Sequence, residues 1–157
     1  MKTKVMSVVC VLALLLTLTA CGGSDSQPQK SAAEIADAIY STQTFQDTLN
    51  AIDADKLGNY YRIDAADLTD SKVYVSGSFS TAEEIAVFQA SSSDAVENIK
   101  KAIDTRLEDL KLAFENYVPG EMTKINDPVL ITKGTTVVLV LADDTAAVSD
   151  QVNELLK

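Results

Sequence analysis

Carboxylates are the main side chains of this 157-residue sequence that could do chemistry, with 23 Asp and Glu, 13 Lys and Arg, and no histidine. Histidine is the usual general base near neutral pH and the commonest transition-metal ligand. Its absence excludes Ser-His-Asp catalysis, Cys-His catalysis and zinc chemistry. An enzyme built from this sequence would need two carboxylates that converge in a cleft with their pKa values driven apart.

Two pairs of adjacent acidic residues are the first candidates for such chemistry. Glu83 and Glu84 begin a predicted strand, on which neighbours point to opposite faces, so they cannot flank one substrate bond. We interpret them as charges at the start of a strand. Asp143 and Asp144 lie between a predicted central strand and a helix, where ligands bind in many open sheets. Helix capping is the stronger interpretation there, because a carboxylate satisfies exposed amides.

The aspartate-rich segment that begins at Asp53 is a candidate calcium loop. Asp53, Asp55, Gly58 and Asp64 approximate the spacing in which alternating oxygen ligands surround a turn glycine. However, Leu57 takes a ligand position, and Asp64 replaces the longer glutamate that closes such a loop. We therefore interpret these aspartates as turn-forming and cap-forming residues, with weak calcium binding as the alternative. No metal site and no cofactor is predicted.

Tyrosines could line a surface that binds glycan or peptidoglycan, since they combine an apolar ring with a hydroxyl. Tyr117 continues the apolar stripe of a predicted helix, whereas Tyr74 faces opposite Val73 and Val75 on a predicted strand. Tyr74 is thus the better candidate for a functional surface, although packing under a helix is the favoured interpretation. The five tyrosines are Tyr40, Tyr60, Tyr61, Tyr74 and Tyr117.

Cys21 is the residue for which the surrounding pattern indicates a covalent modification. It ends an apolar run that begins at Val5 behind a positive n-region, and Leu18, Thr19 and Ala20 precede it. This arrangement resembles the bacterial lipoprotein signal, which implies cleavage before Cys21 and a thioether-linked diacylglycerol on its sulfur. A transmembrane helix and an ordinary secretory signal are the alternatives. The run is shorter than the ~20 residues that span a bilayer, and an ordinary signal needs no cysteine after the cut.

The predicted organisation follows from that cut: a signal peptide over 1–20, the lipidated Cys21 and a flexible tether over 21–30, and one globular domain over 31–157. Removing residues 1–20 leaves 11 basic and 23 acidic residues, a formal charge of about −12. Phosphate backbones repel such a domain, so nucleic acid is excluded as a partner. The expected partners are the membrane, through the diacylglyceryl anchor on its extracytoplasmic face, and an envelope protein or a cell-wall component.

The periodicity of apolar residues predicts an α+β fold, with a mainly antiparallel sheet of about four strands packed against amphipathic helices. A capping box at Ser31 opens the first helix, and the spacing of Phe45, Leu49 and Ile52 predicts a second helical piece. A tight turn at Lys133-Gly134 joins the last two strands. The other predicted elements are strands over 72–79, 84–90, 129–132 and 136–142, a helix over 94–117, and a final helix behind Asp143 or Asp144.

Several short motifs between residues 31 and 142 support a family resemblance. They are Tyr60-Tyr61-Arg62-Ile63-Asp64, Val73-Tyr74, the block 82–88, Arg106-Leu107-Glu108, and Tyr117 followed by Pro119-Gly120-Glu121. The chain resembles a small lipoprotein family of Gram-positive anaerobes, catalogued as domain of unknown function 4358. That resemblance implies a surface lipoprotein and brings no catalytic or binding residue with it.

We therefore expect a non-enzymatic, membrane-anchored envelope lipoprotein that binds or positions a partner. The alternatives are a tethered hydrolase or lyase that depends on carboxylates, and a weak calcium-binding surface protein.

Overall fold

The computed structural model describes residues 29–157. The predicted signal peptide, Cys21 and nearly all of the predicted tether lie outside these residues. Across the described part of the chain, the helices are too short or too polar to cross a bilayer.

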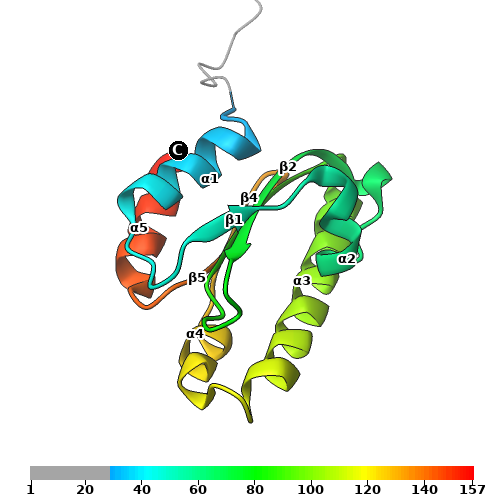
Figure 1. Ribbon diagram of the computed structural model, residues 1–157. Helices are drawn as coiled ribbons and strands as arrows, with labels where there is room; N and C mark the ends of the chain where they lie inside the picture. Colours follow the sequence, from blue (N-terminus) through cyan, green and yellow to red (C-terminus); the bar gives the residue numbers. More distant parts are fainter. Residues whose placement is uncertain (1–28) are drawn as a thin grey trace, which may run out of the picture.

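The strands form one antiparallel sheet, as predicted, in the order β1-β2-β3-β5-β4. It has five strands because residues near 50 add a short one at the edge. Figure 1 labels the elements. In chain order they are α1 (Ala32–Thr42), β1 (Leu49–Ala51), α2 (Leu57–Tyr61), β2 (Leu68–Ser76), β3 (Glu84–Ala90), α3 (Ser93–Phe114), α4 (Met122–Asn126), β4 (Val129–Lys133), β5 (Thr136–Leu141) and α5 (Thr145–Leu155), with three-residue 3-10 turns at Ala54–Lys56, Ala65–Asp67 and Pro119–Glu121.

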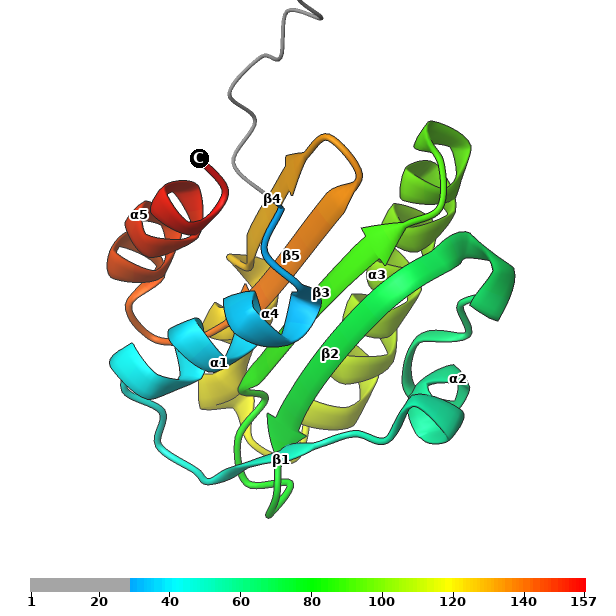
Figure 2. The same ribbon diagram turned by 90° about the horizontal axis from the view of Figure 1, so that it is seen from above.

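Helices cover both faces of the sheet, which gives a three-layer arrangement (Figures 1 and 2). Ile85 and Val87 of β3 point into a core beneath α1 and α5, while Ala86 and Phe88 point into a second core beneath α2 and α3. Alternate residues of a strand face opposite sides, so a strand covered on both faces is apolar throughout. This explains the unbroken apolar run of β5 and confirms its central position.

Local sequence signals set the helix ends as predicted. Ser31 and Glu34 form a capping box, in which each side chain bonds the backbone amide of the other residue at the start of α1. The Asp144 side chain accepts a hydrogen bond from the Ala147 amide and caps α5. Gly134, with φ +59, makes the tight turn between β4 and β5, because glycine adopts this conformation without steric cost.

The helical piece predicted from Phe45 to Ile52 is wrong. Leu49–Ala51 is the edge strand β1, which pairs with Tyr74–Ser76 of β2. The amides of Gln46 and Asp47 donate to the buried Glu83 carboxylate instead of to helix carbonyls. Distant partners therefore override the local apolar spacing.

Two aromatic residues also lie elsewhere than predicted. The strand predicted over 72–79 is β2, and it ends at Ser76, so Phe79 lies beyond it and is 76% exposed. Tyr117 follows the end of α3 at Phe114 and is 75% exposed, so it does not continue the apolar stripe of the helix. Both are surface residues because the chain turns before reaching them.

The domain has two ends, defined by the strand directions. At one end, which we call the amino-terminal end, the Gln89 side chain donates to the Lys30 carbonyl at 2.6 Å, and Lys133 donates to the Lys157 carbonyl at 3.3 Å. At the opposite end, which we call the distal end, are residues 42–48, 76–84, 106–128 and 141–144. The seven residues of β3 separate the two ends by roughly 20 Å.

Candidate functional site

A small pocket opens at the distal end, between the β2–β3 connection and the carboxyl-terminal half of α3. Its volume is about 180 Å³. A dry cavity of about 150 Å³ holds one benzene ring, whereas pockets for drug-sized ligands occupy roughly 300–1,000 Å³. The pocket is therefore the size of one aromatic or branched aliphatic side chain. Its apolar walls come from Tyr60, Val75, Phe79, Ala82, Leu110 and Phe114.

A buried ion pair forms part of the pocket lining. Glu84 is 1% exposed and accepts hydrogen bonds from Nε and Nη2 of Arg106, at 3.2 and 2.6 Å. Its other oxygen bonds the Tyr61 hydroxyl, and burial together with the Glu84 charge raises the pKa of Tyr61 well above its ordinary value. The guanidinium also lies over the Tyr60 ring, 5.4 Å from its centroid. Glu84 does begin β3, as predicted, but its carboxylate is buried and paired with Arg106, which the sequence did not indicate.

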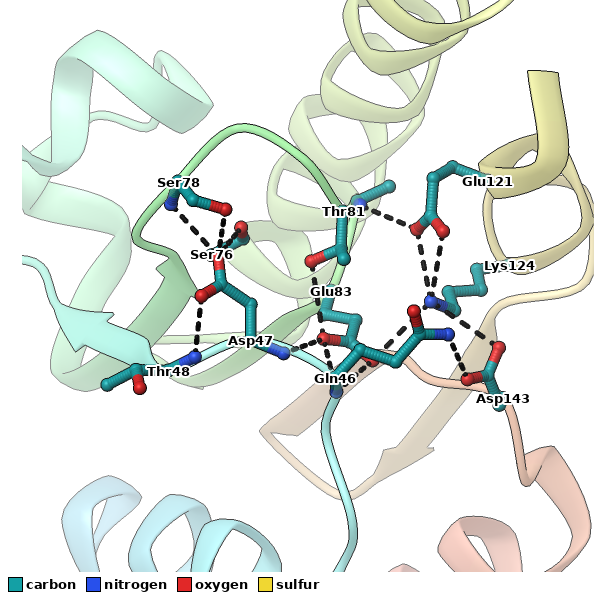
Figure 3. Close-up of polar contacts among 11 residues, drawn as sticks. Gln46, Asp47, Thr48, Ser76, Ser78, Thr81, Glu83, Glu121, Lys124 and Asp143 are labelled. Atoms are coloured by element: carbon teal, nitrogen blue, oxygen red, sulfur yellow. Dashed lines mark hydrogen bonds and ion pairs between the residues drawn. The ribbon is translucent and has the colours of Figure 1, made fainter. Parts of the chain in front are cut away.

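Glu83 belongs to a second buried cluster, on the other face of β3 (Figure 3). Lys124 of α4 is 3% exposed and lies 3.4 Å from Glu83, 3.1 Å from Glu121 and 3.4 Å from Asp143. Glu121 and Lys124 face each other because residues three apart lie on the same side of a helical turn. The two adjacent glutamates do point to opposite faces, which confirms that they cannot flank one substrate bond.

Lys124 stays protonated at neutral pH in the folded protein, because its pKa is raised. Burial by itself lowers the pKa of Lys124, but the hydrogen bond to Glu121 and the charges of Glu83, Glu121 and Asp143 outweigh burial, so the net pKa is raised. Asp143 also accepts a hydrogen bond from the Gln46 side chain at 2.7 Å, which lowers the pKa of Asp143.

Backbone groups complete the cluster and connect distant segments. Glu121 accepts from the Ala82 amide at 2.8 Å, while Glu83 accepts from Gln46 and Asp47 amides near 2.9 Å. The cluster thus joins the segment before β1, the β2–β3 connection and α4 (Figure 3). It builds one wall of the distal end and holds the connection that borders the pocket.

The polar groups around the pocket are already engaged within the chain. Thr81 donates to Glu83, Ser76 donates to Asp47, and Asp109 pairs with Arg62 at 2.8 Å. In the described part of the chain, all buried side-chain nitrogen and oxygen atoms have a hydrogen-bond partner. The pocket therefore presents apolar walls and no unpaired buried charge, which suits an uncharged, apolar guest.

The other sequence candidates do not gather into a site. Asp53 forms an exposed ion pair with Lys56, and Asp64 accepts from the Ala66 amide, so Asp64 has the predicted capping role. Asp144 caps α5, as predicted, while Asp143 joins the Lys124 cluster. Among residues 29–157 no three His, Cys, Asp or Glu side chains are grouped to hold a metal ion.

The tyrosines are divided between the faces of the sheet and form no common surface. Tyr74 packs against Tyr40 beneath α1 and donates to Asp37 at 2.6 Å, which confirms the interpretation that it lies under a helix. Burial and this hydrogen bond raise the pKa of Tyr74 to about 12. Tyr60 and Tyr61 lie on the opposite face, next to Arg106.

Sequence reasoning missed Lys124, Glu121, Asp47 and Phe79 as parts of the site. A lysine in a short polar helix carries no local sign that it is buried, so no sequence signal identifies Lys124. Phe79 does have a sequence signal, since it is the one aromatic residue in the polar run Ser76-Gly77-Ser78-Phe79-Ser80-Thr81. Such runs form turns, and an aromatic residue within one is placed on the surface.

The fold and the site define an α+β domain with helices on both faces of an antiparallel sheet and a small apolar pocket at its distal end. The chain belongs to the family described as Domain of unknown function (DUF4358), whose model matches residues 42–142. That range extends from the end of α1 to just beyond β5, and it includes the pocket and all of the Lys124 cluster except Asp143. No curated protein and no solved structure matches the chain.

Proposed function

We propose that this protein is a membrane-anchored envelope lipoprotein whose domain binds another protein, without catalysing a reaction. Cys21 carries the diacylglyceryl anchor on the extracytoplasmic face, and the distal pocket receives one apolar side chain of the partner. The observation that carries the proposal is the position of the pocket, which lies at the end of the domain opposite to residue 29. The chain enters the described domain at residue 29, far from the pocket, so an anchor upstream of that residue leaves the pocket open to a partner.

Anchoring is supported by the sequence around Cys21 and by the energetics of lipidation. At about 0.8 kcal/mol per buried methylene, two acyl chains hold a protein on a bilayer far more firmly than one chain does. The acidic domain has a net repulsion from anionic headgroups, so the lipid provides the attachment.

Binding is favoured over carboxylate catalysis because the three carboxylates that line the pocket, Glu83, Glu84 and Asp109, are each paired with a cation of the chain. A glycosidase-like enzyme needs one carboxylic acid with a raised pKa opposite an ionised partner. Here hydrogen bonds from Ser76 and Ser78 lower the pKa of Asp47 to about 2, and the pKa of Asp143 is lowered as well. Neither group is suited to donate a proton near neutral pH.

The anchor is tested by the intact mass of the native protein and of Cys21→Ala. The native protein should begin at Cys21 and carry the added mass of lipid, while the variant should remain unprocessed or leave the membrane. An unmodified Cys21 in the native protein rules out the anchor.

The binding site is tested by photo-crosslinking in living cells with p-benzoyl-phenylalanine. One probe replaces Ala113, which is exposed on α3 at the pocket, and a matched probe replaces Ala146, which is exposed on α5. We expect a discrete protein adduct from position 113 and none from position 146. Equal adducts from both positions, or an adduct from position 146 alone, would contradict the proposed site.

A further inference from the structure

Phe79 is held in a conformation that bulky residues seldom adopt. Its φ is +58, and its side chain is 76% exposed at the border of the pocket. A positive φ at an aromatic residue is an outlier, and such residues persist only where the surrounding structure enforces them. Burial within this chain does not explain the arrangement, because most of the ring faces solvent.

The structure that enforces this conformation is a set of hydrogen bonds to Asp47 (Figure 3). The Asp47 carboxylate accepts hydrogen bonds from the Ser76 hydroxyl at 2.6 Å, the Ser78 amide at 2.9 Å and the Ser78 hydroxyl at 2.5 Å. The Gly77 amide donates to the Thr48 carbonyl at 3.1 Å, and a Cβ at Gly77 would lie only 2.6 Å from the Asn50 side chain. The β2–β3 connection is therefore fixed against residues 47–50, and Phe79 is already exposed to solvent before a partner binds.

The surface around Phe79 is strongly acidic. The segments that form the distal end hold ten Asp and Glu against three Lys and Arg. Of the three cations, Lys124 is buried and Arg106 is largely buried against Glu84, so Lys111 is the one that reaches solvent. Arg62 adds a second accessible cation, paired with Asp109. The carboxylates that reach solvent are Asp47, Glu108, Asp109, Glu115, Asp127, Asp143 and Asp144.

We propose that the distal end docks a basic protein segment, which inserts an apolar side chain into the pocket while Phe79 packs against it as an aromatic anchor. This inference rests on the proposed function and specifies its partner. Rigid, exposed aromatic residues beside a pocket are typical of the few contacts that dominate a protein interface. Acidic surroundings select a partner of opposite charge and speed its association. They also disfavour a second copy of this chain, because two such ends repel each other.

The experiment uses the full-length protein in cells, with p-benzoyl-phenylalanine at position 113 as the probe. We expect the crosslinked peptide to come from another protein, to carry net positive charge, and to contain an apolar residue at the adduct. Phe79→Ala should lower the crosslinking yield about tenfold, as loss of a dominant interface contact does. Leu130→Ala is the control, since Leu130 is an exposed apolar residue of β4 outside both the pocket and the distal end, and its yield should be unchanged.

A charge reversal tests whether the acidic surface of the distal end contributes to docking. Glu115→Lys at the distal end should lower the yield, whereas Asp150→Lys, at a position on α5 that is also exposed, should not. An adduct to an acidic segment, to this chain itself, to glycan or to lipid overturns the inference, as does equal yield from Phe79→Ala and Leu130→Ala. If position 113 forms no protein adduct at all, the proposed function fails; if an adduct forms with the wrong charge or without need of Phe79, only this inference fails.

Discussion

Replacing Lys124 with methionine tests whether the buried cluster holds the distal end together. The side chain of Lys124 is 3% exposed, and its neighbours Glu83 and Glu121 are 0% and 9% exposed. Methionine fills a similar volume but leaves both carboxylates without their cation. Desolvated charges that lose a partner are strongly destabilising, whereas exposed ones are rehydrated by water.

The expected loss follows from this burial. Removing one partner of a buried pair costs about 3–5 kcal/mol of unfolding free energy. For a domain of this size each kcal/mol lowers the melting temperature by roughly 4 °C, so Lys124→Met should melt about 12–20 °C below the parent protein. Lys111→Met is the matched control, because Lys111 pairs with Glu108 at the same three-residue spacing but the two side chains are 35% and 70% exposed.

The assay combines thermal melts with urea titrations of each purified protein at neutral pH. Lys111→Met should cost less than about 1 kcal/mol, as exposed ion pairs do. Combining Lys124→Met with Glu121→Gln should cost less than the sum of the single changes, because the two side chains share one interaction. Equal losses from Lys124→Met and Lys111→Met would refute the argument that burial of the cluster stabilises the fold.

Two further predictions concern the connection that carries Phe79. Hydrogen bonds from Ser76 and Ser78 lower the pKa of Asp47 from 3.8 to about 2, so their stabilisation is complete above pH 4 and is lost as the pH falls toward 2. Asp47→Asn should therefore be less stable than the parent in urea titrations at pH 6, with a gap that closes near pH 2; a gap independent of pH would contradict this. Phe79→Gly should raise the unfolding free energy by about 0.5–1 kcal/mol, because relief of the left-handed conformation, worth about 1–2 kcal/mol, exceeds the entropic cost of glycine. The control Tyr117→Gly, at a position with equal exposure and no positive φ, should be less stable than the parent in the same thermal melts, and a stability loss in Phe79→Gly would show that no strain is stored there.

The elements that could be predicted are those specified by neighbours in the chain. The capping box at Ser31, the apolar stripe of α3 and the turn at Gly134 each depend on contacts within a few residues. The alternation along β2 and the continuous apolar run of β5 identify both segments as strands by the same local logic. These signals were enough for the α+β class, the antiparallel sheet and the order of its main elements.

The candidate site could be predicted only in part. The sequence identifies Glu83 and Glu84 as adjacent acids, and strand geometry predicts that their side chains point in opposite directions. Their burial does not follow from strand geometry, because Lys124 and Arg106 are about 40 and 20 residues away in the chain and become neighbours only when α4 and α3 reach the sheet. The edge strand β1 also depends on a distant partner. Its apolar residues have helical spacing, but the segment forms a strand because β2 pairs with it.

The sequence by itself determined the charge of the domain, the absence of histidine chemistry, the motif at Cys21 and the local course of most elements. Tertiary structure alone decided which charges are buried, where Phe79 and Tyr117 lie, and that a pocket the size of one side chain opens at the distal end. The physical reason is the distance along the chain between the residues that interact. Hydrogen bonds at helix ends and turns join residues a few positions apart, whereas desolvation of a charge depends on every segment that packs around it.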